Sequence, residues 1–304
     1  MAGRPLLSSL LAVIALVLML AGRPANAIAA ERPHRIVSLN LCTDDLLWRL
    51  ADRGQIASLS FLSADPSESL IASQIKGVAL NYGRAEEVRL LEPDLVLAGT
   101  YGARFAVELL KSRGYRVIEL PPADRLGDIA EQIETIGKAI GQSARAEAMA
   151  ADVRDRLAEL ERTRPSTNVT AIVFQPRGYA AGAPSLADDV LTLAGARNLA
   201  AEAGFKSWVP LGVEGLLELD PQLVVIDSSS RAAPSIAQGI LSHPALRYFR
   251  ARHRMIRVDS NLWACGTPRT LDAVDQVRAA IDAFPRQSAA SEVGASTSTR
   301  AASW

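Results

Sequence analysis

The chain has little histidine and cysteine, two residue types that metal sites and catalytic centres often use. Among 304 residues there are three histidines, and their positions show no metal-ligand spacing: His34, His243 and His253. The sequence has no Gly-x-Ser-x-Gly elbow, no phosphate-binding loop, no Gly-x-Gly-x-x-Gly after a strand and no Cys-x-x-Cys. We therefore expect no catalytic residue and no metal ion held by protein ligands, and an enzyme is the least favoured class.

An excess of charge of one sign is also missing. The chain has 33 Lys and Arg against 33 Asp and Glu, so its formal net charge is zero. Residues 1–27 contain Arg4 and Arg23 and no acid, which leaves 31 basic against 33 acidic residues in the remainder, a balance of −2. A nucleic-acid partner needs a basic face, so none is expected.

The N-terminus has the features of a secretory signal peptide. Arg4 provides a positive start, and the segment from Leu6 to Leu20 is nearly all apolar. It is shorter than the roughly 20 residues that span a bilayer, which disfavours a membrane anchor. Ala25-Asn26-Ala27 then places small residues where a signal peptidase cleaves. We expect residues 1–27 to be removed near Ala27 and the mature protein to be periplasmic.

The rest of the chain alternates between short apolar strands and amphipathic helices, and the alternation occurs twice. Strands are expected at 35–40, 55–61, 95–98 and 115–120, and again at 170–174, 223–227 and 255–258. Between the two sets lies a stretch rich in Ala, Arg, Glu and Leu that predicts helices over 126–140 and 143–164. The pattern predicts an α/β fold of two Rossmann-like lobes with mostly parallel sheets, joined by one long helix. The expected boundaries are 28–142, 143–164 and 165–285, with a disordered tail over 286–304.

One unit is repeated in the two halves. The segment from Glu86 to Leu97 and the segment from Glu214 to Val225 both read Glu-x6-Pro-x-Leu-Val. Each predicts a short helix, a turn led by proline and a buried strand. The same unit in the same place of each half indicates an internal duplication.

This repeated unit resembles the periplasmic binding proteins with a helical backbone that deliver iron–siderophores, haem or cobalamin to ABC importers. The resemblance covers roughly Arg35 to Phe284. It implies a monomer without a covalently bound cofactor, whose partner is the permease in the inner membrane. In this family one glutamate of each lobe docks onto the permease, and Glu86 and Glu214 occupy those positions. Taken alone, the two residues are better explained as solvated glutamates favoured at helix starts, and it is the resemblance that favours docking.

The resemblance also implies a ligand site. Hydroxamate-siderophore binders of this family carry an arginine, a tyrosine and two tryptophans at places matched here by Arg84, Tyr101, Trp208 and Trp263. Tyr179 follows an expected strand end, where α/β folds bind ligands, and Tyr82 precedes the first of the two repeated helices. Each aromatic has a structural alternative, as a partly buried packing residue.

The resemblance favours a ferric hydroxamate as the ligand. Cobalamin is the alternative, and haem, with Tyr101 as an iron ligand, is the third. If the protein does not serve transport, the alternative function is that of a periplasmic sensor built on the same fold.

Two cysteines, Cys42 and Cys265, fall in loops on the expected ligand side of the two lobes. An even number of cysteines in an oxidising compartment permits a disulfide. We expect these two residues to be bridged, with two free thiols as the alternative.

Overall fold

The computed structural model describes residues 32–227, 239–252 and 254–283, and these residues contain two β-sheets. The expected signal peptide, the expected tail and His253 lie outside the described residues. Within the described part, no helix is both long and apolar enough to cross a membrane.

The first sheet is parallel throughout and has the strand order β3-β2-β1-β4-β5. Its strands are β1 (Ile36–Ser38), β2 (Ile56–Ser60), β3 (Leu80–Asn81), β4 (Leu95–Gly99) and β5 (Val117–Leu120). The helices between them are α2 (Leu41–Leu50), α3 (Ala85–Leu90) and α4 (Arg104–Ser112). β1 and β4 are buried almost completely, as expected of strands covered by helices on both faces.

The second sheet has the order β11-β10-β6-β7-β9. In addition, β8 pairs with the first two residues of β6, Thr170 and Ala171. Its strands are β6 (Thr170–Phe174), β7 (Tyr179–Ala181), β8 (Arg197–Asn198), β9 (Trp208–Pro210), β10 (Leu223–Asp227) and β11 (Met255–Val258). The helices are α7 (Leu186–Leu193), α8 (Leu199–Glu202), α9 (Gly212–Leu219), α11 (Arg247–Arg250) and α12 (Thr270–Asp282). β7 and β9 are antiparallel to their neighbours, so this sheet is only mostly parallel.

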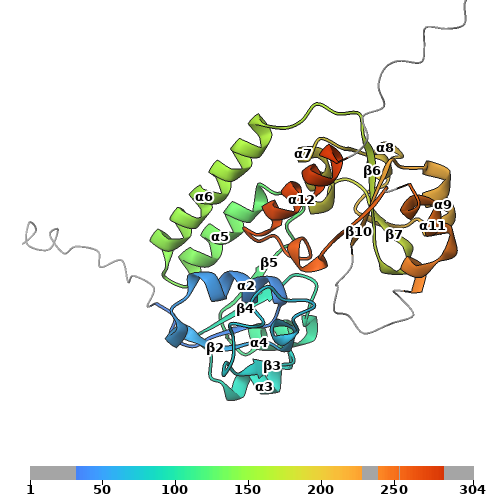
Figure 1. Ribbon diagram of the computed structural model, residues 1–304. Helices are drawn as coiled ribbons and strands as arrows, with labels where there is room; N and C mark the ends of the chain where they lie inside the picture. The colour runs from blue at the N-terminus through green and yellow to red at the C-terminus, as the bar shows by residue number, and fades with distance from the viewer. Residues whose placement is uncertain (1–31, 228–238, 253, 284–304) are drawn as a thin grey trace, which may run out of the picture. The chain divides into compact units, whose positions relative to one another are not determined.

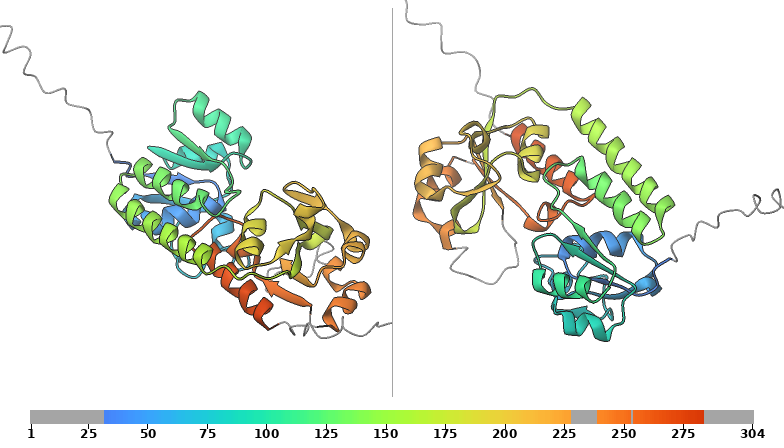
Figure 2. Two further views of the ribbon diagram at one scale, coloured as in Figure 1. Left: turned by 90° about the horizontal axis from the view of Figure 1, so that it is seen from above. Right: turned by 180° about the vertical axis from the view of Figure 1, so that it is seen from behind.

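Along the chain, two helices follow the last strand of the first sheet and precede the first strand of the second: α5 (Asp128–Ala139) and α6 (Ser143–Arg162). They pack side by side (Figure 1, Figure 2). Gly137 allows the close approach, because a Cβ atom there would lie 2.0 Å from the Cβ of Ala146. The buried face of α6 follows a helical spacing through Ala146, Ala150 and Val153.

Helix α6 also contacts α12 of the second lobe. Arg156 forms an ion pair with Asp275 at 2.6 Å, and Arg278 donates hydrogen bonds to the carbonyl oxygens of Leu160 and Leu193. A regular helix fastened at both ends is stiffer than a flexible linker. The prediction of two lobes joined by one long helix is confirmed, and large opening motions are not expected of this connection.

The duplication predicted from the sequence extends to the backbone. In both repeats an acidic residue with a positive φ follows the short helix, Glu92 at 45° after α3 and Asp220 at 39° after α9. Non-glycine residues seldom adopt this conformation. A proline follows each, and then a buried strand that pairs with the first strand of its half, β4 with β1 and β10 with β6.

Some local predictions were wrong at their boundaries. The first strand ends at Ser38 rather than residue 40, because the Asn40 side chain caps α2. Its Oδ1 accepts hydrogen bonds from the amides of Cys42 and Thr43 at 2.9 and 3.3 Å, so the helix starts at Leu41. Four short strands of two or three residues, β3, β7, β8 and β9, were not predicted.

Candidate ligand-binding site

A cavity of about 570 Å³ lies at the carboxyl ends of three neighbouring strands of the first sheet, β1, β4 and β5. The opposite wall comes from three segments of the second lobe. Cavities of this size are typical of small-molecule sites. Its lining comprises Asn40, Cys42, Thr43, Gly99, Thr100, Tyr101, Gly102, Leu120, Pro121, Pro122, Ala123, Asp124, Gln132, Ser185, Leu186, Ser207, Trp208, Trp263, Ala264, Cys265 and Gly266.

The wall formed by the first lobe depends on the packing of Asn40 against Gly99. A Cβ atom at Gly99 would lie 2.9 Å from Nδ2 of Asn40, which is too close for any larger residue without a shift. Because Asn40 also caps α2, the same side chain fixes the helix start and the end of β4. The backbone at the ends of β1 and β4 is thereby held at the edge of the cavity.

Three of the predicted ligand-binding aromatics line the cavity. Tyr101 is 81% exposed, Trp208 is half-buried and Trp263 is only 5% exposed. The indole Nε1 of Trp263 is buried, and within the described part of the chain it has no hydrogen-bond partner. Buried donors are nearly always paired. This indole is thus a candidate donor to an acceptor atom of a ligand.

The other three predicted ligand residues do not line this cavity. Tyr82 stacks on Phe61, with ring centroids 5.0 Å apart, and its ring is 65% exposed. The Arg84 side chain is 74% exposed and its Nη1 lies 3.8 Å from Oε1 of Glu87. Tyr179 lies on β7 and is 37% exposed. Contact between these residues and a ligand stays a prediction.

Several residues of the lining were not singled out by the sequence reasoning. They include the segment after β5 and one place on the second lobe: residues 121–124 and Ser185–Leu186. The segment after β5 carried a usable signal. Pro121-Pro122 follows directly on a parallel strand, and ligands bind at such strand ends.

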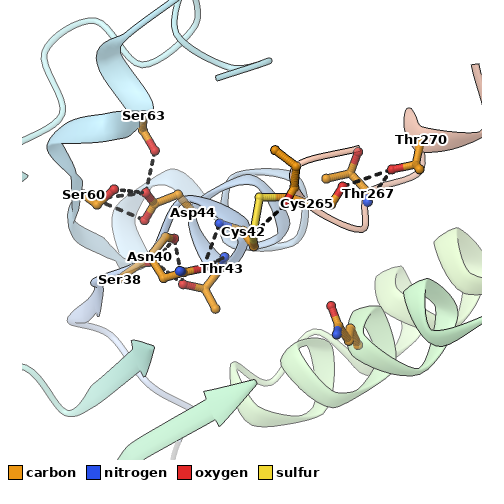
Figure 3. The surroundings of a disulfide bond; sticks show 12 residues. Ser38, Asn40, Cys42, Thr43, Asp44, Ser60, Ser63, Cys265, Thr267 and Thr270 are labelled. Carbon is orange, nitrogen blue, oxygen red and sulfur yellow. Dashed lines mark hydrogen bonds between the residues drawn. A yellow bond between two sulfur atoms is a disulfide. The ribbon is translucent and has the colours of Figure 1, made fainter. Parts of the chain in front are cut away.

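A disulfide joins the two walls of the cavity. Cys42, in the first turn of α2, is bonded to Cys265, which precedes α12, and their Cα atoms are 5.1 Å apart (Figure 3). Thr270 fixes the second partner, since its hydroxyl donates a hydrogen bond to the carbonyl oxygen of Cys265 at 3.0 Å. The lobes are therefore covalently tied at a point that lines the cavity.

Asp44, two residues after Cys42, is a fully buried carboxyl group. It accepts hydrogen bonds from the hydroxyls of Ser60 and Ser63, at 2.6 and 2.5 Å, and from the amide of Ser60 (Figure 3). Burial raises the pKa of Asp44 to about 7, and the hydrogen bonds from the serines offset part of that effect. Around neutral pH the group is therefore partly protonated inside the protein.

The raised pKa predicts that the protein loses stability between pH 5 and pH 8. The carboxyl group of Asp44 has a pKa of about 7 in the folded protein and of 3.8 in the unfolded chain, so the folded state holds the proton more tightly. This stabilisation is fully present below pH 3.8 and is lost as the pH rises through 7. The expected decrease in the free energy of unfolding is on the order of 2 to 3 kcal/mol. Urea titrations at pH 5, 6.5 and 8 measure it. Asp44→Asn, which cannot ionise, serves as the control, and equal pH slopes in the two proteins would refute the assignment.

The two repeated glutamates lie on the surface, in the first turns of α3 and α9. Both Glu86 and Glu214 are exposed, and in the described part of the chain neither forms an ion pair. Their position near a helix N-terminus favours a negative charge. Both carboxylates are thus accessible to a partner, and no cation among the described residues neutralises them.

Comparison with known proteins agrees with this architecture. Residues 36–255 match the sequence profile of a family described as periplasmic binding protein. A protein of Halobacterium salinarum named cobalamin-binding protein is 28% identical over 220 residues, which cover 70% of this chain. The match spans 58% of that relative's length.

Two solved structures show how far the likeness extends. A periplasmic haem-binding protein from Pseudomonas aeruginosa is 28% identical with a TM-score of 0.64, covering 82% of this chain and 92% of the other. A structure described as an ABC-type Fe3+-hydroxamate transport system, from Saccharomonospora viridis, is 23% identical with a TM-score of 0.63. The match covers 83% of this chain and 94% of the chain in that structure. At this sequence identity the likeness shows a shared fold alone.

Proposed function

This chain belongs to the family of periplasmic binding proteins, and from that premise we propose that it captures a metal chelate between its two lobes and delivers it to the permease of an ABC importer. The observation that carries the proposal is the cavity lined from both lobes by Tyr101, Trp208 and Trp263. Large rings pack against an extended, partly planar ligand, and the buried indole of Trp263 provides a donor. Binding rather than catalysis is the function that these residues support.

Cobalamin is the ligand that we propose first. The Halobacterium relative that matches over most of this chain is named a cobalamin-binding protein. The sequence had favoured a ferric hydroxamate, with the Arg84 guanidinium binding its oxygens. Arg84 is absent from the cavity lining, which removes the most specific part of that argument. A corrinoid or ferric chelate brings its own metal ligands, so no protein ligand is required.

A ferric hydroxamate is the second candidate. Three of the four residues that carried the resemblance to hydroxamate binders, Tyr101, Trp208 and Trp263, do line the cavity. Haem is the third candidate, with Tyr101 as the iron ligand.

Delivery requires contact with the membrane partner. We propose that Glu86 and Glu214, one in each lobe, dock onto cationic side chains of the permease. We also propose that residues 1–27 are a cleaved signal peptide, that the mature protein is a periplasmic monomer, and that its lobes span 28–142 and 165–285.

Titration of the intrinsic tryptophan fluorescence tests the ligand. Trp208 and Trp263 line the cavity, so a coloured chelate bound there quenches their emission. We expect saturable, submicromolar quenching by cyanocobalamin and affinities at least about tenfold weaker for ferrichrome and haem. Tighter binding of ferrichrome would replace cobalamin by the second candidate. Quenching by none of the three would remove the chelate proposal.

A further inference from the structure

The segment after β5, residues 121–124, brings a negative charge to the ligand cavity. Asp124 ends this segment, and within the described ranges it is the one charged residue of the cavity lining. The rest of that lining is neutral and consists of aromatic rings, amides, hydroxyls and apolar side chains. Asp124 is exposed, and its carboxylate forms no ion pair or hydrogen bond with a described residue. Its charge is therefore available to a ligand in the cavity.

Two side chains of α5 hold this segment in place. Nε2 of Gln132 donates a hydrogen bond to the carbonyl oxygen of Pro121 at 2.8 Å. Oδ2 of Asp128 accepts hydrogen bonds from the amides of Asp124 and Arg125, at 3.0 and 2.9 Å. The position of Asp124 at the cavity is thus set by a regular helix rather than by a free loop.

Three more carboxylates lie beside Asp124, at the starts of two helices. Asp128 begins α5, and Asp188 and Asp189 lie in the first turn of α7. Oδ2 of Asp189 accepts a hydrogen bond from the amide of Leu126 at 2.9 Å, so α7 of the second lobe meets the same segment. Carboxylates from both sides of the cavity therefore gather at this edge.

These carboxylates are close enough to act on one another. Burial raises the pKa of Asp189, and the neighbouring charges of Asp188 and Asp128 add to that effect. The backbone amide of Leu126 and the Arg125 guanidinium act in the opposite direction. One guanidinium does not balance the carboxylates, so an anion brought to this edge would meet repulsion.

The two helix starts that line the cavity are already capped. Such a terminus attracts anions through its free backbone amides. At α2 the Asn40 side chain accepts hydrogen bonds from the amides of Cys42 and Thr43. At α7 the hydroxyl oxygen of Ser185 accepts one from the amide of Asp188 at 3.1 Å. An anionic ligand would have to displace these caps to reach the amides.

We propose that Asp124 is a specificity-determining residue and that the cavity selects neutral and cationic chelates against anionic ones. This inference rests on the proposed capture of a metal chelate and narrows its ligand class. Cyanocobalamin and ferrichrome carry no net charge, whereas haem carries two propionate groups. An anionic group would lose its water on entering and find no cation in the described lining to compensate, which is costly.

Ligands that differ only in charge test the selection. One side-chain amide of cyanocobalamin is replaced by a carboxylate, a methylamide or an aminoethylamide, which gives a negative, a neutral and a positive chelate. Ferrioxamine B provides a second series, in which its amino group is succinylated, acetylated or left free. We expect affinity, measured by calorimetric titration, to rise about threefold to tenfold with each step from negative to positive. Raising the salt concentration should reduce these differences, because salt screens exposed charges.

Asp124→Asn tests the residue, because it removes the charge and keeps the size of the side chain. We expect the ratio of affinities between the positive and the negative chelate to fall at least about threefold. Asp152→Asn is the matched control, since Asp152 is exposed on α6 and does not line the cavity. It changes the net charge of the protein by the same amount and should keep the wild-type ratio.

Each outcome bears on the proposal. A charge preference that Asp124→Asn weakens and Asp152→Asn does not supports it. Equal affinities within a series that binds refute the charge selection and leave the capture of a chelate intact. A preference that Asp124→Asn leaves unchanged refutes the role of Asp124. If no member of either series binds, the proposed capture of a chelate fails, and this inference fails with it.

Discussion

Glu86→Ala combined with Glu214→Ala abolishes uptake by cells, while the affinity of the purified protein for its ligand stays within about twofold of wild type. Both carboxylates are exposed, lack an ion-pair partner in the described part of the chain, and lie outside the cavity lining. Their removal therefore leaves the ligand site unchanged. It deprives the permease cations of their partners in both lobes at once, so we expect binding to the permease to weaken at least about a hundredfold.

Two measurements separate docking from capture. Uptake of radiolabelled cyanocobalamin by cells reports on the whole cycle, and calorimetric titration of the purified protein reports on capture alone. Because exposed charges are screened, the association rate of the wild type should also fall as salt is raised, and that of the double variant should not. Glu218→Ala, a change at an exposed glutamate of α9, serves as the control. A fall in ligand affinity of the double variant would place the glutamates in the ligand site and refute the docking role.

Trp263→Ala reduces the affinity for the ligand by about 30-fold or more, and Trp263→Phe by about tenfold or less. The ring of Trp263 lines the cavity and is 5% exposed, so alanine removes a large contact surface. Phenylalanine retains most of that surface but has no N–H group. The difference between the two variants therefore isolates the ring from the donor at Nε1, which has no partner in the described part of the protein.

The control for Trp263 is Trp48, a tryptophan of similar burial that lies outside the cavity lining. Trp48 is 7% exposed, does not line the cavity, and its Nε1 donates to Oε1 of Gln74 at 3.1 Å. Trp48→Phe should therefore lower stability but leave affinity unchanged. Calorimetry is preferable to fluorescence here, since the substitutions remove the reporter. If Trp263→Phe binds as tightly as wild type, the indole N–H is not a ligand donor.

The prediction from sequence succeeded where structure is local. The alternation of short apolar segments with amphipathic helices fixes the α/β class, and the segment from Ser143 to Arg162 forms the long helix because it contains no glycine or proline. The repeated Glu-x6-Pro-x-Leu-Val unit located the same helix, turn and buried strand in both halves. The error at the end of the first strand also has a local cause. The Asn40 side chain caps α2, and so the strand ends before residue 40.

The ligand site was predicted only in part, and the strand order explains which part. The cavity lies at the ends of β1, β4 and β5, which are neighbours in the first sheet, and so Tyr101 lines it. Tyr82 and Arg84 follow β3, which lies at the far edge of the same sheet, beyond β2. All these residues follow a strand end, and nothing in the sequence ranks one strand end above another.

The amino-acid sequence by itself thus determined the two α/β halves, their long connecting helix and the two exposed glutamates, because each follows from residues close together in the chain. Only the tertiary structure decided which strand ends face the second lobe, that Asp44 is buried among serines, and that Trp263 lies in the cavity wall with a donor that has no partner among the described residues. These properties arise from contacts between residues as many as 223 positions apart in the chain, such as Cys42 with Cys265. Contacts at that distance depend on strand order and lobe packing, for which local patterns hold no information.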